Sequence, residues 1–291
     1  SEFLQFSQGN IDFISGLDPS YKDELLTSIG KLRHKYTSTV NMVSGDYLNT
    51  EYLGFYMDTK QSEIQSALIR KAINYGFDRK TMIKYLRNGI GTPAENGFIP
   101  KGLPSFNNLK GFTYQPEKAK ELVNQFKKET GITVPKITIA TNSNYVDLCE
   151  YIQRKLEKIG LTVTIDLLTS STLKEGKSKG TLPVFRASWV ADYPDAENYL
   201  SLFYSKNFTP NGPNYTHFKN DRYDSLYENA LREIDLKKRH HFYQQMDSIV
   251  INNAPVIPLY YDQVIRFSQK NIHGLGINPI NLLHLKRVSK K

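Results

Sequence analysis

Residues Lys136–Leu167, with the sequence KITIATNSNYVDLCEYIQRKLEKIGLTVTIDL, decide the fold of this 291-residue chain. The first six predict a strand, the amphipathic segment 145–158 ahead of Gly160 predicts a helix, and 161–167 predict a second strand. Two strands joined by a crossover helix form a βαβ unit, whose strands are parallel. Residues 182–189, LPVFRASW, predict a third strand parallel to these two. The pattern indicates an α/β fold, with ligands near the carboxyl ends of the parallel strands.

Helix signals are frequent outside this unit. Asp18-Pro19 combines a capping residue with a proline at the first helical position, and Asp78 is a second capping residue. Further helices are predicted over 18–30, 63–75, 78–89, 115–131, 170–177, 195–203, 222–232 and 236–253, and further strands over 256–261, 264–267 and 282–288.

Composition limits the class of protein. With 39% hydrophobic and 12% aromatic residues, the chain is too apolar for a disordered protein. Its one cysteine, Cys149, excludes internal disulfides and any zinc site built on several cysteines. The net charge of +9 is spread along the whole chain with acids interleaved, which predicts a solvated basic surface and no nucleic-acid binding.

Cofactor and catalytic motifs are weak. Gly89–Ala94 matches a dinucleotide fingerprint in letters, but it follows a predicted helix where the fingerprint needs a strand. Gly176-Lys177-Ser178 resembles the end of a P-loop that lacks its first glycine. No two of the six histidines stand at metal-ligand spacing on a helix, and Cys149 on its predicted helix indicates a packed thiol. We therefore expect no cofactor, no metal site and no enzyme activity.

Residues 185–196, FRASWVADYPDA, carry the candidate site. Arg186 lies within an apolar strand, and burying its charge is costly unless a carboxylate meets it. Arg186 and Asp192 lie at most ~20 Å apart, and an extended tripeptide spans ~10 Å, so they could hold the carboxylate and the ammonium of a peptide. In the alternative interpretation, Arg186 pairs with a local acid and Asp195 only caps the next helix. The expected lining residues are Trp189, Tyr193 and Asn198.

Several blocks resemble one known family in their order along the chain. They are GNIDF at 9–13, YLGFYM at 52–57, IRKAINYGFDR at 69–79, GIGTPA at 89–94, YQPEKAKEL at 114–122, WVADYPD at 189–195 and PVIPLYY at 255–261. This series is similar to the family 5 extracytoplasmic solute-binding proteins, the oligopeptide and dipeptide receptors of ABC importers.

The resemblance implies a lobe of a type II periplasmic binding protein, with a mixed, largely parallel sheet flanked by helices. It places the ammonium of a short peptide at Asp192 and the terminal carboxylate at Arg186, with delivery to a membrane permease and no chemistry. It also implies a bacterial, periplasmic or cell-surface protein, monomeric and lipid-anchored at full length. Only the C-terminal part of the family is matched, so we expect a lead-in at 1–45, the second lobe at 46–263, a returning segment at 264–291 and no N-terminal lobe.

Other functions stay open at this point. The same fold could bind a nickel chelate, haem, a polyamine or an oligosaccharide, since the family includes such binders and a cation would not need Arg186. A hydrolytic enzyme could use Asp192 and Asp195 as acid and base, but their separation across Pro194 favours no defined carboxylate spacing. A nucleic-acid surface would rest on net charge alone.

Overall fold

The computed structural model describes residues 2–16, 18 and 21–291. Within these residues, the main sheet has seven strands in the order β1-β7-β2-β6-β4-β5, with β3 paired to β7, and β8 and β9 form a separate pair. The strands are β1 Phe13–Ser15, β2 Val40–Phe55, β3 Thr92–Pro93, β4 Lys136–Thr141, β5 Thr162–Leu167, β6 Val184–Val190, β7 Val256–Gln269, β8 Ile272–His273 and β9 Ser289–Lys290.

Helices surround this sheet, and most follow the predicted ranges. The α-helices are α1 Glu2–Ser7, α2 Lys22–Leu25, α3 Ser62–Gln65, α4 Ala67–Tyr75, α5 Arg79–Leu86, α6 Pro116–Thr130, α7 Val146–Glu157, α8 Ser170–Lys179, α9 Glu197–Leu200, α10 Asp221–Arg232 and α11 Leu236–Asn253. Short 3-10 turns are η1 His34–Tyr36, η2 Ser143–Tyr145, η3 Ser201–Phe203 and η4 Ser205–Asn207.

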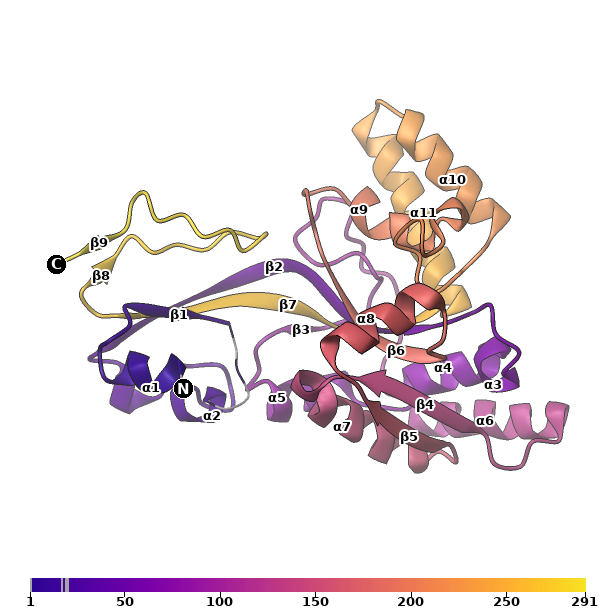
Figure 1. Cartoon of the computed structure of the whole chain (residues 1–291). Coiled ribbons are helices and arrows are strands. Elements are labelled where there is room, and N and C mark those ends of the chain that lie inside the picture. The colour runs from indigo at the N-terminus through magenta and orange to yellow at the C-terminus, as the bar shows by residue number, and fades with distance from the viewer. Residues whose placement is uncertain (1, 17, 19–20) are drawn as a thin grey trace.

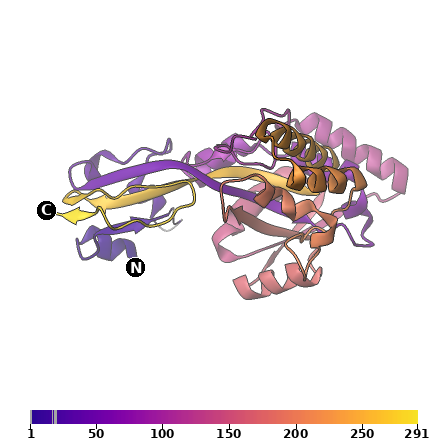
Figure 2. The same ribbon diagram turned by 90° about the horizontal axis from the view of Figure 1, so that it is seen from above.

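Two long antiparallel strands, β2 and β7, connect the two parts of the molecule (Figure 1). The larger part holds the βαβ unit and most of the helices. The smaller part holds α1, α2, β1, β8 and β9, and both chain ends lie in it, as the view from above also shows (Figure 2). The predicted boundaries at 45/46 and 263/264 fall inside β2 and β7, and they stay predictions.

The mixed sheet flanked by helices confirms the predicted fold class, with a smaller parallel portion than the sequence suggested. Strand β4 pairs parallel with β5 along its whole length and parallel with β6 only through Val184 and Phe185. The remaining pairings of the described strands in this sheet are antiparallel, including β6 with β2. The long β2–β7 ribbon accounts for the difference, because strands so far apart in sequence leave no local signal of their pairing.

Helix α5 begins after the capping residue that the sequence predicted, and helix α6 begins and ends where the sequence predicted. The Asp78 side chain accepts the backbone N–H groups of Lys80 and Thr81 at the start of α5. Helix α6 begins at Pro116, and Gly131 follows its end with a left-handed backbone conformation, φ 74°. Side chains that satisfy the free backbone groups of a first turn stabilise the helix start.

Two predicted elements are wrong, and two predicted strands are joined into one. Among the described residues of 18–30, only the four of α2 are helical, because Leu26 and Leu32 bridge as strands around a turn at Gly30. Residues 19 and 20, which include the predicted Pro19, lie outside the described residues. Residues 282–288 form no strand, and the terminal strand is β9 instead. The two strands predicted over 256–261 and 264–267 are one continuous strand, β7.

Two apolar cores lie on the two faces of the sheet around β2 and β6. Leu53 and Val184 belong to one core, and Tyr52 and Phe185 belong to the other. Side chains alternate between faces along a strand. The side chain of Arg186 therefore lies on the face of Val184, whereas Trp189 packs against the second core.

Two buried arginines of the 69–79 block tie helices to the rest of the lobe. Arg70 donates to the carbonyls of Ile64, Gln65, Asn253 and Ala254, at 2.6 to 3.3 Å. Arg79, 1% exposed, donates to carbonyls on α4, β7 and the loop at Phe112. Burial lowers the pKa of each arginine to about 10. This block therefore holds the scaffold together.

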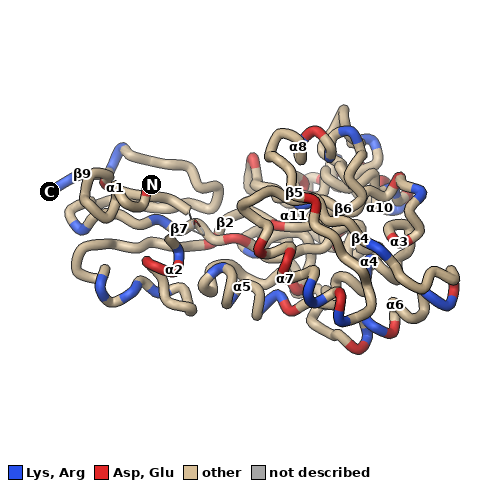
Figure 3. Tube along the Cα trace, turned by 60° about the horizontal axis from the view of Figure 1, so that its bottom comes forward, with Lys and Arg blue, Asp and Glu red and all other residues tan. Residues whose placement is uncertain are grey.

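The surface charges are mixed in sign. Basic and acidic positions are interspersed along the trace, with uncharged stretches between them (Figure 3). This arrangement agrees with the solvated basic surface predicted from the sequence. No helix among the described residues is long and apolar enough to cross a membrane.

Candidate functional site

Asn198 fixes the loop that carries Asp192. Its side chain is 5% exposed, and its Oδ1 accepts the indole N–H of Trp189 at 2.8 Å and the backbone N–H of Asp192 at 3.2 Å. Its Nδ2 donates to Asp192 Oδ2 at 3.3 Å. The structure therefore brings together three of the five predicted site residues, with Asn198 between the other two.

The carboxylate of Asp192 is otherwise open. Asp192 is exposed, and within the described part of the chain no lysine, arginine or histidine forms an ion pair with it. An exposed carboxylate held by one neutral amide can accept an ammonium group from a ligand. This is the chemistry that the sequence predicted for Asp192.

Tyr193 and Asp195 make separate contacts. The Tyr193 hydroxyl donates to Glu197, and the side chain is 46% exposed. Asp195 accepts the backbone N–H of Glu197 at 2.9 Å and pairs with Arg239 at 3.5 Å. Asp195 precedes Ala196, the N-cap residue of α9, and its side chain bonds only the first backbone N–H of that helix, so its capping role stays a prediction. Its partners differ from those of Asp192, and no hydrogen bond joins the two carboxylates among the described residues.

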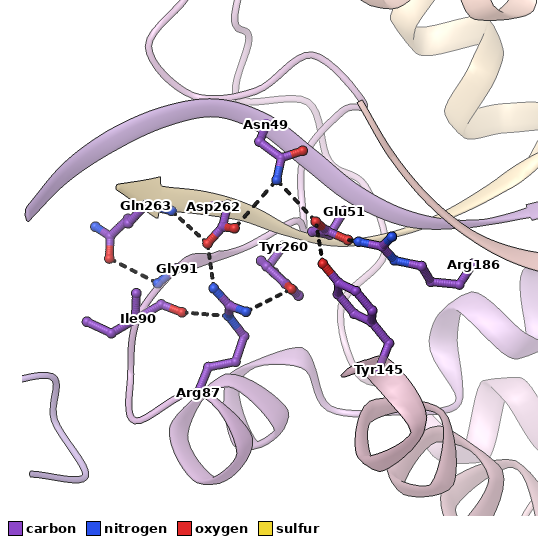
Figure 4. Close-up of polar contacts among 10 residues, drawn as sticks. All are labelled: Asn49, Glu51, Arg87, Ile90, Gly91, Tyr145, Arg186, Tyr260, Asp262 and Gln263. Atoms are coloured by element: carbon purple, nitrogen blue, oxygen red, sulfur yellow. Dashed lines mark hydrogen bonds and ion pairs between the residues drawn. The ribbon is translucent and has the colours of Figure 1, made fainter. Parts of the chain in front are cut away.

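Arg186 has a buried partner. Its Nη2 lies 2.6 Å from Glu51 Oε2, with the two side chains 13% and 3% exposed (Figure 4). The guanidinium carbon stands 3.4 Å from the centre of the Tyr145 ring. Glu51 is distant from Arg186 in sequence and lies on β2. It stands two positions before Leu53, the residue of β2 that pairs with Arg186 of β6. No hydrogen bond joins Arg186 to Asp192, Trp189, Tyr193 or Asn198 in the described part of the chain.

A second ion pair continues this cluster toward β7. Arg87 donates to Asp262 at 2.5 Å and to the Tyr260 hydroxyl at 2.9 Å. Asn49 joins the two pairs, since its Nδ2 donates to Glu51 at 3.1 Å and to Asp262 at 3.5 Å (Figure 4). We call the set of Glu51, Arg186, Arg87 and Asp262 the charge cluster.

Burial sets the protonation of this cluster. Burial raises the pKa of Glu51 above its usual range, and the positive charge of Arg186 opposes that rise. Burial alone would lower the pKa of Arg186, but Glu51 and Tyr145 more than offset it, so this pKa is raised. Burial, together with the charge of Glu51, raises the pKa of Tyr145 to about 12. Arg186 therefore keeps its charge, which Glu51 balances.

Strand β6 has an open edge beside these groups. It pairs with β2 along its whole length, but on its other side β4 reaches only Val184 and Phe185. Beyond that point β4 ends at Thr141 and the chain turns into η2. The backbone of residues 186–190 thus has no strand partner on that side among the described residues. An unpaired edge of this kind can accept an extended peptide as an added strand.

A cavity of about 310 Å³ adjoins the charge cluster between the two parts of the molecule. Arg87 and Tyr145 belong to both the cavity wall and the network around the cluster. The opposite wall comes from the smaller part and includes Tyr21 and Lys22.

Metal and thiol chemistry receive no support from the geometry. Within the described residues, no group of three or more His, Cys, Asp or Glu side chains could hold a metal ion. Cys149 is buried in the core, and burial raises the pKa of its thiol to about 11. It is the packed thiol that the sequence indicated.

The sequence did not identify Glu51, Asn49 or Tyr145. The one available signal was Arg186 itself, because a buried arginine requires an acid. With 29 acidic residues in the chain, that requirement alone does not select Glu51.

Sequence comparisons find relatives over most of the chain. The family described as "Bacterial extracellular solute-binding proteins, family 5 Middle" matches residues 1–211. The dipeptide-binding protein of Escherichia coli K12 is 24% identical over 262 residues, which are 88% of this chain and 48% of that protein. Heme-binding protein A of Haemophilus influenzae is 29% identical over 249 residues, 83% of this chain and 42% of that one. The chain spans about half the length of the curated relatives it matches.

Solved structures share the fold. The periplasmic binding protein DppA from Helicobacter pylori, in complex with the peptide STSA, has a TM-score of 0.83 at 23% identity, over 99% of this chain and 54% of that one. AppA from Bacillus subtilis, in complex with a nonapeptide, has a TM-score of 0.81 at 21% identity, over 99% and 57%. NikA from Staphylococcus aureus, in complex with Ni(L-His)2, has a TM-score of 0.80 at 14% identity, over 99% and 59%.

Proposed function

This chain belongs to the bacterial extracellular solute-binding proteins of family 5, and from this premise we propose that it binds peptides for an ABC importer. Outside the cytoplasm, the whole protein captures a peptide in a cleft beside β6 and then delivers it to a membrane permease. It acts as a receptor without chemistry, in agreement with relatives that are named as binding proteins. We also propose that it works as a lipid-anchored monomer.

The observation that carries this proposal is the open edge of β6 directly before Asp192. A peptide added along residues 186–190 would exchange backbone hydrogen bonds that do not depend on its sequence. At the end of the same edge, Asp192 offers a carboxylate that is free of cationic partners among the described residues. Backbone pairing plus one end charge is a recognition scheme for peptides as a class.

Trp189, Asn198 and Tyr193 support the site in different ways. Asn198 orients the Asp192 loop, and Trp189 is held by the same amide oxygen, so both contribute rigidity. Tyr193 is half-exposed next to Asp192 in the chain and offers an aromatic surface to a ligand side chain. An oriented carboxylate loses less entropy when it binds than a mobile one.

Calorimetry on the full-length protein tests the proposal. Titration with a set of peptides of two to eight residues should show binding that Asp192→Asn weakens by about 2 kcal/mol or more, because the bound ammonium loses its charge partner. Asp195→Asn is the matched control: it lies three residues away and contacts α9 and Arg239, so peptide affinity should stay nearly constant.

Two results would contradict the proposal. One is the same peptide affinity in Asp192→Asn as in the unchanged protein. The other is the absence of peptides from the ligand carried by the native protein, as identified by mass spectrometry under non-denaturing conditions.

A further inference from the structure

The buried pair of Glu51 and Arg186 bears on which peptides can bind, and this inference rests on the proposed function. Glu51 Oε2 and Arg186 Nη2 are 2.6 Å apart. The other oxygen of Glu51 accepts hydrogen bonds from Asn49 at 3.1 Å and from the Tyr145 hydroxyl at 3.4 Å. Each carboxylate oxygen therefore has a protein partner, and the charge of Arg186 is balanced before any ligand arrives.

The length of a peptide decides what it presents to Arg186. Arg186 and Asp192 are separated by at most ~20 Å of extended backbone, and the two side chains shorten the gap that a ligand must span. A tripeptide with its ammonium at Asp192 spans ~10 Å along the open edge, so its carboxylate extends toward Arg186. A longer peptide passes Arg186 with uncharged peptide groups.

The four side chains of the charge cluster balance one another's charges before any ligand binds. Glu51 and Asp262 balance Arg186 and Arg87, so the four side chains carry no net charge. A ligand carboxylate would be a third anion beside Arg186, Arg87 and the nearby amine of Lys177, whose pKa is lowered to about 8 by burial and by the charge of Arg186. Burial raises the pKa of Glu51 and the charge of Arg186 opposes the rise, so a negative charge at this place depends on a cation beside it. Like charges in a poorly solvated site repel strongly.

We propose that Glu51 is a specificity-determining residue that masks Arg186, so that the receptor discriminates against peptides whose terminal carboxylate reaches Arg186. The preferred ligands are peptides of four or more residues, or peptides with an uncharged C-terminus. Di- and tripeptides with a free carboxylate bind more weakly. Arg186 then acts as a structural partner of Glu51 and Tyr145, and it does not hold a ligand carboxylate.

Matched ligands test this without any substitution. One tripeptide is prepared as the free acid and as the C-terminal amide, and each is titrated into the full-length protein by calorimetry, together with a hexapeptide of the same first three residues. We expect the amide and the hexapeptide to bind more tightly than the acid. Equal affinity of acid and amide, or a preference for the acid, would overturn the proposal.

Glu51→Gln then isolates the cause. The glutamine side chain keeps the shape of Glu51 but leaves the charge of Arg186 unbalanced. The ratio of the affinity for the free-acid tripeptide to the affinity for its C-terminal amide should therefore rise at least tenfold. The gain should disappear in Glu51→Gln combined with Arg186→Gln, and thermal melting checks that each variant is folded. An unchanged ratio in a folded Glu51→Gln variant would also overturn the proposal.

The outcomes separate this proposal from the one on which it rests. If peptides bind and depend on Asp192 but the acid is preferred, the proposed function stands and the role of Glu51 is wrong. If none of the peptides binds, both are wrong.

Discussion

Asp247 Oδ1 accepts the backbone N–H of Phe98 at 2.7 Å, in an interior position where Asp247 is only 1% exposed. The carboxylate belongs to α11, and it holds the loop that follows β3. The space around it is full, because a Cβ added at Gly97 would stand 1.8 Å from Asp247 Oδ2. This contact ties a helix near the C-terminal side of the chain to a loop 149 residues earlier.

The pH dependence of stability should report on Asp247. Burial raises the pKa of this carboxyl from 3.8 to about 7, and the backbone N–H groups of Phe98 and Ile99 oppose the rise. Between pH 3.8 and about pH 7, Asp247 holds a proton in the folded state that it has released in the unfolded state. The contribution of Asp247 to stability is therefore fully present below about pH 4 and is lost as the pH rises toward 7.

Asp247→Asn removes this dependence. In urea unfolding, the stability of the unchanged protein relative to the variant should fall by about 2 to 3 kcal/mol between pH 5 and pH 8. Asp166→Asn, at an exposed position, controls for the substitution itself. The raised pKa of Asp247 would be contradicted if the unchanged protein and Asp247→Asn differed in unfolding free energy by the same amount at every pH.

Arg79→Met should destabilise the fold without touching the site. The guanidinium donates to the carbonyls of Pro258, Asn74 and Phe112, and the variant removes this donor from all three oxygens. Each such group costs about 1–3 kcal/mol, so we expect a loss of several kcal/mol in the free energy of unfolding. Arg154→Met, at an exposed ion pair on α7, should change it by less than about 1 kcal/mol. Equal effects of the two substitutions would contradict the structural role of Arg79.

Asn198→Ala should loosen the loop that carries Asp192. The indole N–H of Trp189 and the backbone N–H of Asp192 lose their shared acceptor, at a cost of about 1–3 kcal/mol in stability. Trp189 is the only tryptophan of the chain, so its fluorescence reports on this site alone. We expect a shift of the emission maximum in this chain, and a lower peptide affinity in the full-length protein. An unchanged spectrum and affinity would show that Asn198 does not organise the loop.

Much of the architecture could be predicted because its causes are local. The βαβ unit follows from periodicity within 32 residues, and Asp78, Pro116 and Gly131 mark helix ends through their own backbone preferences. The false helix over 18–30 shows the limit of such signals, since the pairing of Leu26 with Leu32 overrides the local preference. The β2–β7 ribbon was missed as a pair because its register depends on packing across more than 200 residues of chain.

The sequence by itself determined the α/β class, the family and the group of Trp189, Asp192 and Asn198. These three residues lie within ten positions, on the end of β6, the following turn and helix α9, so local geometry brings them together. Only the tertiary structure decided the state of Arg186. Its partner Glu51 is 135 residues away, and the two meet because the register of β2 against β6 places both on one face of the sheet. A buried charge requires a partner, but only the packing of the strands selects which one.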